Sequence, residues 1–108
     1  AEDIGEIEIG DKGKEIVNGV LEHKEEIDNI ISLYSTKRTI SRIPKVSLAI
    51  LRIAVYEALY DELTPVNAAI SEAVLLSQAF SYKEDTGFVN GVLSSFAKNI
   101  SEEKSLNA

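Results

Sequence analysis

The sequence contains no cysteine and only one histidine, His23. Without cysteine the chain has neither a disulfide framework nor a thiolate metal site, which is typical of proteins of the reducing cytosol. A single histidine does not supply the ligands of an ordinary zinc site. His23 lies in an acidic stretch between Glu22 and Glu25, which predicts a solvated surface side chain rather than a catalytic one. We therefore expect a cytoplasmic protein with no metal and no cofactor.

Long apolar runs and catalytic motifs are also missing. No apolar run reaches the ~20 residues that a membrane-spanning helix requires, and no signal-peptide pattern opens the chain. The sequence has no nucleophile beside a base, no pair of tuned carboxylates and no glycine-rich phosphate loop. Gly87 and Gly91 match no nucleotide-binding fingerprint, so close helix packing is the better explanation for Gly91. We expect a protein that is not an enzyme, has no catalytic residue and does not contact a membrane.

The formal net charge of -7 is concentrated in the first third of the chain. Residues 1–35 hold ten acidic and three basic residues, whereas residues 36–108 hold eight of each. The neutral part includes a basic group, Lys37, Arg38, Arg42 and Lys45. Such a group is a candidate phosphate-binding site, but solvated charge beside a loop is the interpretation that the sequence alone favours.

Hydrophobic residues recur with the period of amphipathic helices in residues 14–35, 45–62 and 65–80, and again after the polar loop 81–87. The segment 45–62 is apolar on nearly all sides and should cross the centre of the fold. Thr64 before Pro65 is predicted to be an N-cap, and Asp85 or Thr86 to cap the last helix. The fold class is therefore all-α, a bundle of about four main helices. Residues 1–108 form a single domain in this interpretation, with 1–12 as a linker or tail and 101–108 as a flexible tail.

Two charged residues interrupt the apolar faces of the predicted helices. Arg52 lies inside the core helix and Glu72 lies on the inward part of the next one. An isolated buried charge costs several kcal/mol, so we predict that Arg52 and Glu72 form a structural ion pair. Glu57 is a second, less well placed partner for Arg52.

Three motifs carry a resemblance to a known family: LRIAVYE at 51–57, ISEAV at 70–74 and FVNGVL at 88–93. Their order and spacing resemble the C-terminal half of the NusB family. Residues 14–31 look like the helix that precedes this half, so the resemblance covers about four-fifths of the chain. It implies an all-helical NusB-like fold and a role in transcription antitermination on ribosomal RNA operons.

The resemblance also implies partners and sites. NusB-like proteins bind single-stranded boxA RNA of rRNA operon leaders together with the ribosomal protein NusE and other Nus factors. By this analogy, RNA contacts are expected from Lys83, Asp85, Thr86 and Phe88, and partner contacts from Lys45, Ser47 and Leu48. Phe88 would stack on a base, or alternatively belong to the core while Asp85 or Thr86 caps the helix.

The sequence departs from the family pattern at several places. The arginine-rich first helix and the helix after it are absent, Ser47 replaces a usual acid, and Ser71 replaces a usual asparagine. We therefore expect part of the apolar stripe Ile16, Val20, Ile27, Ile31 and Tyr34 to need another cover, such as a second copy in a homodimer. An accessory domain of a ribosomal RNA cytosine methyltransferase is the alternative function. The short polar tail after FVNGVL favours the free-standing factor.

Overall fold

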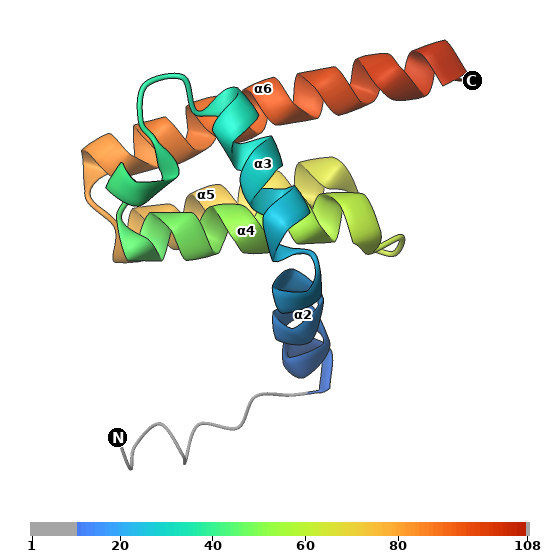
Figure 1. Cartoon of the computed structure of the whole chain (residues 1–108), viewed down its shortest axis with the longest axis horizontal. Helices are drawn as coiled ribbons and strands as arrows, with labels where there is room; N and C mark the ends of the chain where they lie inside the picture. The colour runs from blue at the N-terminus through green and yellow to red at the C-terminus, as the bar shows by residue number, and fades with distance from the viewer. Residues whose placement is uncertain (1–10, 108) are drawn as a thin grey trace.

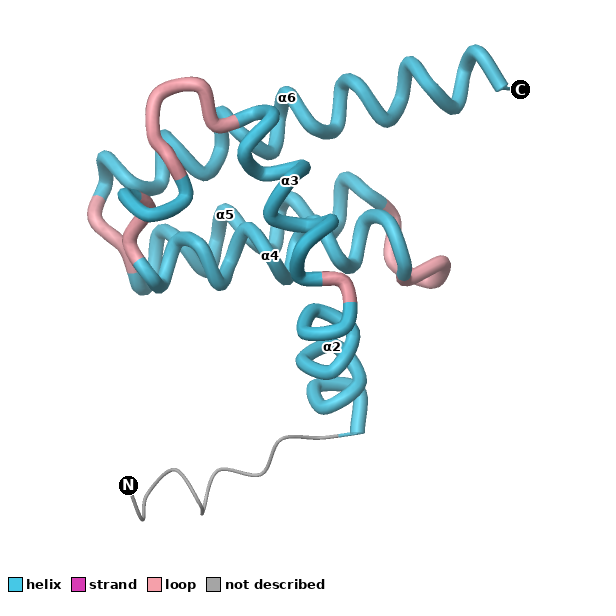
Figure 2. Tube along the Cα trace, viewed as in Figure 1, coloured by secondary structure: helices cyan, strands magenta, loops and turns pink. Residues whose placement is uncertain are grey.

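A computed structural model of the protein describes residues 11–107, with the side chains of residue 12 and residues 101–107 excepted (Figure 1). The elements are α2 (Asp11–Glu22), α3 (Lys24–Tyr34), a 3-10 turn η1 (Ile40–Arg42), α4 (Lys45–Tyr60), α5 (Val66–Phe80) and α6 (Lys83–Asn107). The described residues form helices and loops without a strand, which confirms the all-α class (Figure 2). Residues 1–10, most of the predicted linker, lie outside the described residues.

The centre of the fold is the antiparallel pair α4 and α5, with α6 packed alongside the pair and α3 crossing α4 (Figure 1). Helix α4 contacts α2, α3, α5 and α6, so the prediction of a central helix over this segment is confirmed. Its residues Leu51 and Val55 are buried beside Ile27 of α3 and Leu93 of α6. The rest of the core comes from α3, α4, α5 and α6 and from the residue before Pro44: Ile31, Ile43, Ile50, Ala54, Ala73, Val89, Val92, Phe96 and Ile100.

The single helix predicted over residues 14–35 is interrupted at His23, which separates α2 from α3. His23 has φ -106° and ψ 17°, and its ring stacks on Tyr60 of α4 at 4.2 Å between centroids. Its Nδ1 also lies 3.6 Å from a carboxylate oxygen of Glu26. The half-exposed His23 is therefore a packing residue at the α2–α3 junction. The periodic pattern missed the break because the same apolar period continues on both sides of it.

Three predicted helix ends also differ from the structure. Pro65 rather than Thr64 is the N-cap of α5, because the Thr64 hydroxyl donates to Asp61 Oδ2 at 2.8 Å. Helix α6 begins at Lys83, so Asp85 and Thr86 lie in its first turn and neither is the N-cap. Residues 101–107, predicted as a tail, continue α6 as helix.

The predicted ion pair between Arg52 and Glu72 is wrong. Arg52 donates from Nε and NH2 to the two carboxylate oxygens of Asp28 at 2.8 and 2.9 Å, whereas Glu72 is exposed on α5. The partner is on α3 because this helix, not α5, packs against the side of α4 that carries Arg52. Both side chains are about one-fifth to one-quarter exposed, so the pair lies at the edge of the core.

Glycine packing also differs from the prediction. A Cβ at Gly91 would meet nothing within 4 Å, so close helix packing does not explain this glycine. The close approach is instead at Gly19, where an added Cβ would overlap the ring of Tyr56. Gly19 therefore lets α2 lie directly against α4. In the described part of the chain, no helix has the length and apolarity needed to cross a membrane.

Candidate nucleic-acid interface

The start of α6 and the connection between α3 and α4 lie at the same end of the molecule (Figure 1). The α5–α6 junction and the first turn of α4 meet there, with Ser47 Oγ 3.5 Å from Ser81 Oγ. In the connection, the Ser35 hydroxyl donates to the carbonyl oxygen of Arg38. These contacts place Arg38 next to the first turns of α6.

Arg38 joins this connection to α6 through two contacts. Its NH1 donates to Asp85 Oδ1 at 2.8 Å, and its guanidinium carbon lies 4.5 Å from the centroid of the Phe88 ring. A guanidinium on an aromatic face is a cation–π contact, and a planar cation of this kind also recognises phosphate. The basic group predicted as ordinary solvated charge therefore contributes an arginine that is held beside an aromatic side chain.

The four residues predicted to contact RNA lie close together but differ in exposure. Lys83 is exposed, and Phe88 is half-buried beneath Arg38. Asp85 is only 9% exposed, so its main contact is the ion pair with Arg38. The hydroxyl of Thr86 lies 3.0 Å from that of Ser77 and 3.3 Å from the carbonyl oxygen of Tyr82. Of the four, Lys83 is therefore the exposed side chain, and part of the Phe88 side chain is also accessible to a ligand.

The three residues predicted to contact a protein partner occupy the first turn of α4. Lys45 is exposed, and Leu48 is half-buried against the core. Ser47 is 0% exposed, so its side chain offers no surface to a partner and that part of the prediction is wrong. The reason is that this face of α4 is covered by the α5–α6 junction, as the Ser47–Ser81 contact shows. A partner contact stays a prediction for Lys45 and Leu48.

Most basic residues around this end come from one stretch of the chain, whereas the first turn of α6 adds the acidic residues Glu84 and Asp85. Residues 29–56 include Lys37, Arg38, Arg42, Lys45 and Arg52 but no acidic residue. Arg52 is paired with Asp28, and Arg38 with Asp85. The other three basic side chains are exposed, so this face can attract a polyanion although the chain as a whole is acidic.

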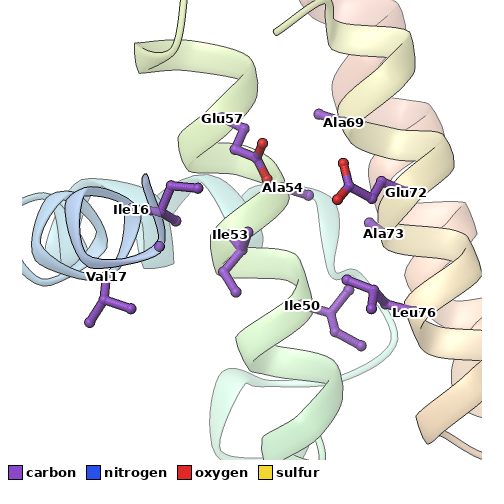
Figure 3. A pocket seen from close by; sticks show the side chains of 11 residues that line it. Ile16, Val17, Ile50, Ile53, Ala54, Glu57, Ala69, Glu72, Ala73 and Leu76 are labelled. Carbon is purple, nitrogen blue, oxygen red and sulfur yellow. The ribbon is translucent and has the colours of Figure 1, made fainter. Parts of the chain in front are cut away.

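A second surface feature is an apolar groove between α2, α4 and α5, with a volume of about 380 Å3 (Figure 3). Ile16 and Val17 form one wall, and the carboxylates of Glu57 and Glu72 point into the space between α4 and α5. Of the predicted stripe, Ile27 and Ile31 are fully buried, whereas Ile16 lines this groove. The predicted homodimer stays a prediction. Among the described residues, no group of three potential ligands could hold a metal ion.

Comparison with known proteins identifies the family. Residues 8–98 match the model of the NusB family. The chain is 45% identical over 86 residues to the transcription antitermination protein NusB of Caldicellulosiruptor saccharolyticus, covering 80% of this chain and 66% of that protein. It is 42% identical over 89 residues to the protein of the same name from Bacillus subtilis, covering 82% of this chain and 68% of that protein.

A solved structure gives the same result. NusB from T. maritima superposes with a TM-score of 0.74 and 32% identity, over 82% of this chain and 66% of that one. The chain thus spans about two-thirds of the length of the proteins that it matches. The motifs at 51–57, 70–74 and 88–93 all fall within the matched residues. The chain belongs to the NusB family.

Proposed function

We propose that this protein acts in transcription antitermination by binding boxA-type single-stranded RNA together with NusE. The observation that supports this most directly is the placement of Arg38 on the face of Phe88 beside the first turn of α6. Proteins bind single-stranded RNA by stacking bases on aromatic rings and guanidinium planes, with nearby cations on the phosphates. The names of the relatives favour an antitermination factor over the accessory domain of a methyltransferase.

In this proposal the two predicted surfaces have separate tasks. Lys83, Arg38 and Phe88 contact the RNA, whereas the exposed first turn of α4, with Lys45 and Leu48, faces NusE. The chemistry is binding only, because neither surface combines a nucleophile with a base. Lys45 follows the connection that carries Arg38, so RNA and protein partner would lie side by side and could stabilise each other's binding.

The test is titration of labelled boxA-like RNA with the chain, alone and with purified NusE, at low salt. Phe88→Leu keeps an apolar side chain against the core but removes the ring. We expect it to weaken RNA binding by about fivefold or more, because one stacked base contributes about 1–3 kcal/mol. Leu63→Ala is the control, since Leu63 is an exposed apolar residue in the α4–α5 connection, at the opposite end of the molecule (Figure 1). Equal affinity of the Phe88 variant and the control, or no RNA binding with NusE present, would overturn the proposal.

A further inference from the structure

We propose that the hollow between α6 and the end of α3 is a nucleotide-binding subsite for single-stranded RNA. This inference rests on the proposed function and adds a second contact to it. The base would lie against Tyr34 and Phe88, and the adjoining phosphate would face Lys37. Of the four RNA-contact residues that the family resemblance implies, Phe88 alone lines this hollow, and Lys37 comes from the basic group noted in the sequence.

The shape of the hollow suits one unstacked base. It has a volume of about 220 Å3 and is lined by Tyr34, Thr36, Lys37, Gly87, Phe88, Gly91, Val92 and Ser95. Pockets for drug-sized ligands begin at about 300 Å3, so this one fits a smaller planar group. At both glycines an added Cβ would meet nothing within 4 Å, so the floor is open backbone that a base can approach closely.

One wall of the hollow is fixed in place before any ligand binds. The Tyr34 hydroxyl accepts a hydrogen bond from the side-chain amide of Asn99, and its ring meets Phe96 edge-on at 6.0 Å between centroids. The second aromatic residue of the lining, Phe88, is in contact with Arg38. A site whose aromatic walls are already positioned loses less conformational entropy when it binds a base.

The charge of the hollow favours a phosphate. Lys37 is exposed, it has no ion-pair partner in the described part of the chain, and no acidic side chain lines the hollow. Arg38 next to it is already paired with Asp85, so Lys37 is the unneutralised cation. A second hollow of about 250 Å3 shares Thr36 and Lys37 and continues along Ser35 and Thr39. An RNA strand that places one base in the first hollow can therefore lay its sugar-phosphate backbone along the polar side chains of the second hollow.

Two pairs of variants test the subsite by titration of labelled boxA-like RNA at low salt. Gly91→Leu places a side chain in the hollow, and we expect about tenfold weaker binding from the lost stacking. Its control is Ser94→Leu, on an exposed position of α6 that does not line the hollow. Lys37→Gln should weaken binding and make the slope of log affinity against log salt shallower by roughly 0.7. Its control is Lys24→Gln, the same charge change at the far end of α3.

We expect Gly91→Leu to stay folded, because leucine has the higher helix propensity and an added Cβ at this position meets nothing within 4 Å. Cross-linking of RNA that contains 4-thiouridine should label Tyr34, Phe88 or Lys37, located by mass spectrometry of the digested protein. If RNA binds but both variants match their controls and cross-links fall elsewhere, the subsite is wrong and the proposed function stands. If neither the chain nor its complex with NusE binds RNA, the proposed function fails together with the subsite.

Discussion

Gly19 and Gly91 lie in helices, but their surroundings are opposite. A methyl group at Gly19 would overlap the Tyr56 ring, which would have to leave its tilted contacts with His23 and Tyr60. We expect Gly19→Ala to destabilise the protein by about 1–2 kcal/mol, since overpacking outweighs the gain in helix propensity. Gly91→Ala meets open space and should stabilise by roughly 0.5–1 kcal/mol. Urea unfolding of both variants measures the change in the free energy of unfolding. Equal changes would contradict the difference in packing around Gly19 and Gly91.

The Asp28–Arg52 pair predicts a second contrast at the residue scale. The Arg52 guanidinium donates two hydrogen bonds to the carboxylate of Asp28 at the edge of the core, so Asp28→Asn should cost roughly 1–3 kcal/mol. Glu72→Gln should change the free energy of unfolding by less than about 0.5 kcal/mol, because Glu72 is exposed. The measurement is chemical denaturation of each variant and of Arg52→Met. If the Glu72 change cost as much as the Asp28 change, the assignment of the Arg52 partner would be refuted.

These residues also show what the sequence could and could not predict. The need of Arg52 for a carboxylate follows from its place in an apolar helix. The choice among Asp28, Glu57 and Glu72 depends on which helix packs on that side of α4, and helical periodicity carries no such information. The same holds for Arg38, whose charge is visible in the sequence. Its position on Phe88 was not predictable, because the two residues are 50 positions apart in the sequence and meet only in the folded chain.

At the scale of elements, His23 at the α2–α3 junction packs against the rings of Tyr56 and Tyr60 in α4. Tyr60 also makes a hydrogen bond to α3 that depends on pH. The Tyr60 hydroxyl donates to Glu26 Oε2 at 2.6 Å. This hydrogen bond is the largest cause that raises the pKa of Tyr60 above its ordinary value of 10.0, followed by burial and by the charge of Glu26. The fold therefore favours the neutral phenol. The resulting stability is present below about pH 10 and is lost as pH rises through the raised pKa.

We expect the difference in stability between the wild-type chain and Tyr60→Phe to shrink as pH rises above about 10, since the phenolate cannot donate to Glu26. Unfolding curves at a series of alkaline pH values measure this difference. Tyr82→Phe, at an exposed position, controls for the loss of one phenol. A difference that stays constant with pH would show that the Tyr60–Glu26 bond does not contribute to stability.

The helices themselves were largely predictable because each has an apolar face with a regular period. Their ends were less so. The start of α6 at Lys83 was hidden by the polar residues of its first turns, where Asp85 and Thr86 are used by Arg38 and Ser77 instead of capping the helix. The break at His23 coincides with ring stacking on Tyr60 of another helix, a contact about which helical periodicity carries no information.

At the scale of the whole molecule, charge limits the affinity for RNA. The chain carries a net charge of -7, and the exposed cations near the proposed RNA interface are Lys37, Arg42 and Lys83, apart from Lys45 in the surface assigned to NusE. Neutralising about three phosphates of a single strand gives a slope of log affinity against log salt of roughly -2. We therefore expect the chain alone to bind boxA-like RNA with a Kd above about 1 μM at physiological salt. Titrations at several salt concentrations measure both values, and submicromolar binding would contradict this expectation.

The break at His23 leaves α2 packed mainly against α4, with little contact to α3. Among the residues of α2 with described side chains, only Gly19 is buried, whereas α3 contributes Ile27 and Ile31 to the core. Helices with few buried side chains open as local units without global unfolding. We expect the backbone amides of α2 to exchange with deuterium well before those of α3 and α4. Mass spectrometry of peptides from exchanged protein would show this, and Gly19→Ala should speed exchange in α2 alone. Opening of α2 would widen the apolar groove, so the wall formed by Ile16 and Val17 is a movable part of that surface.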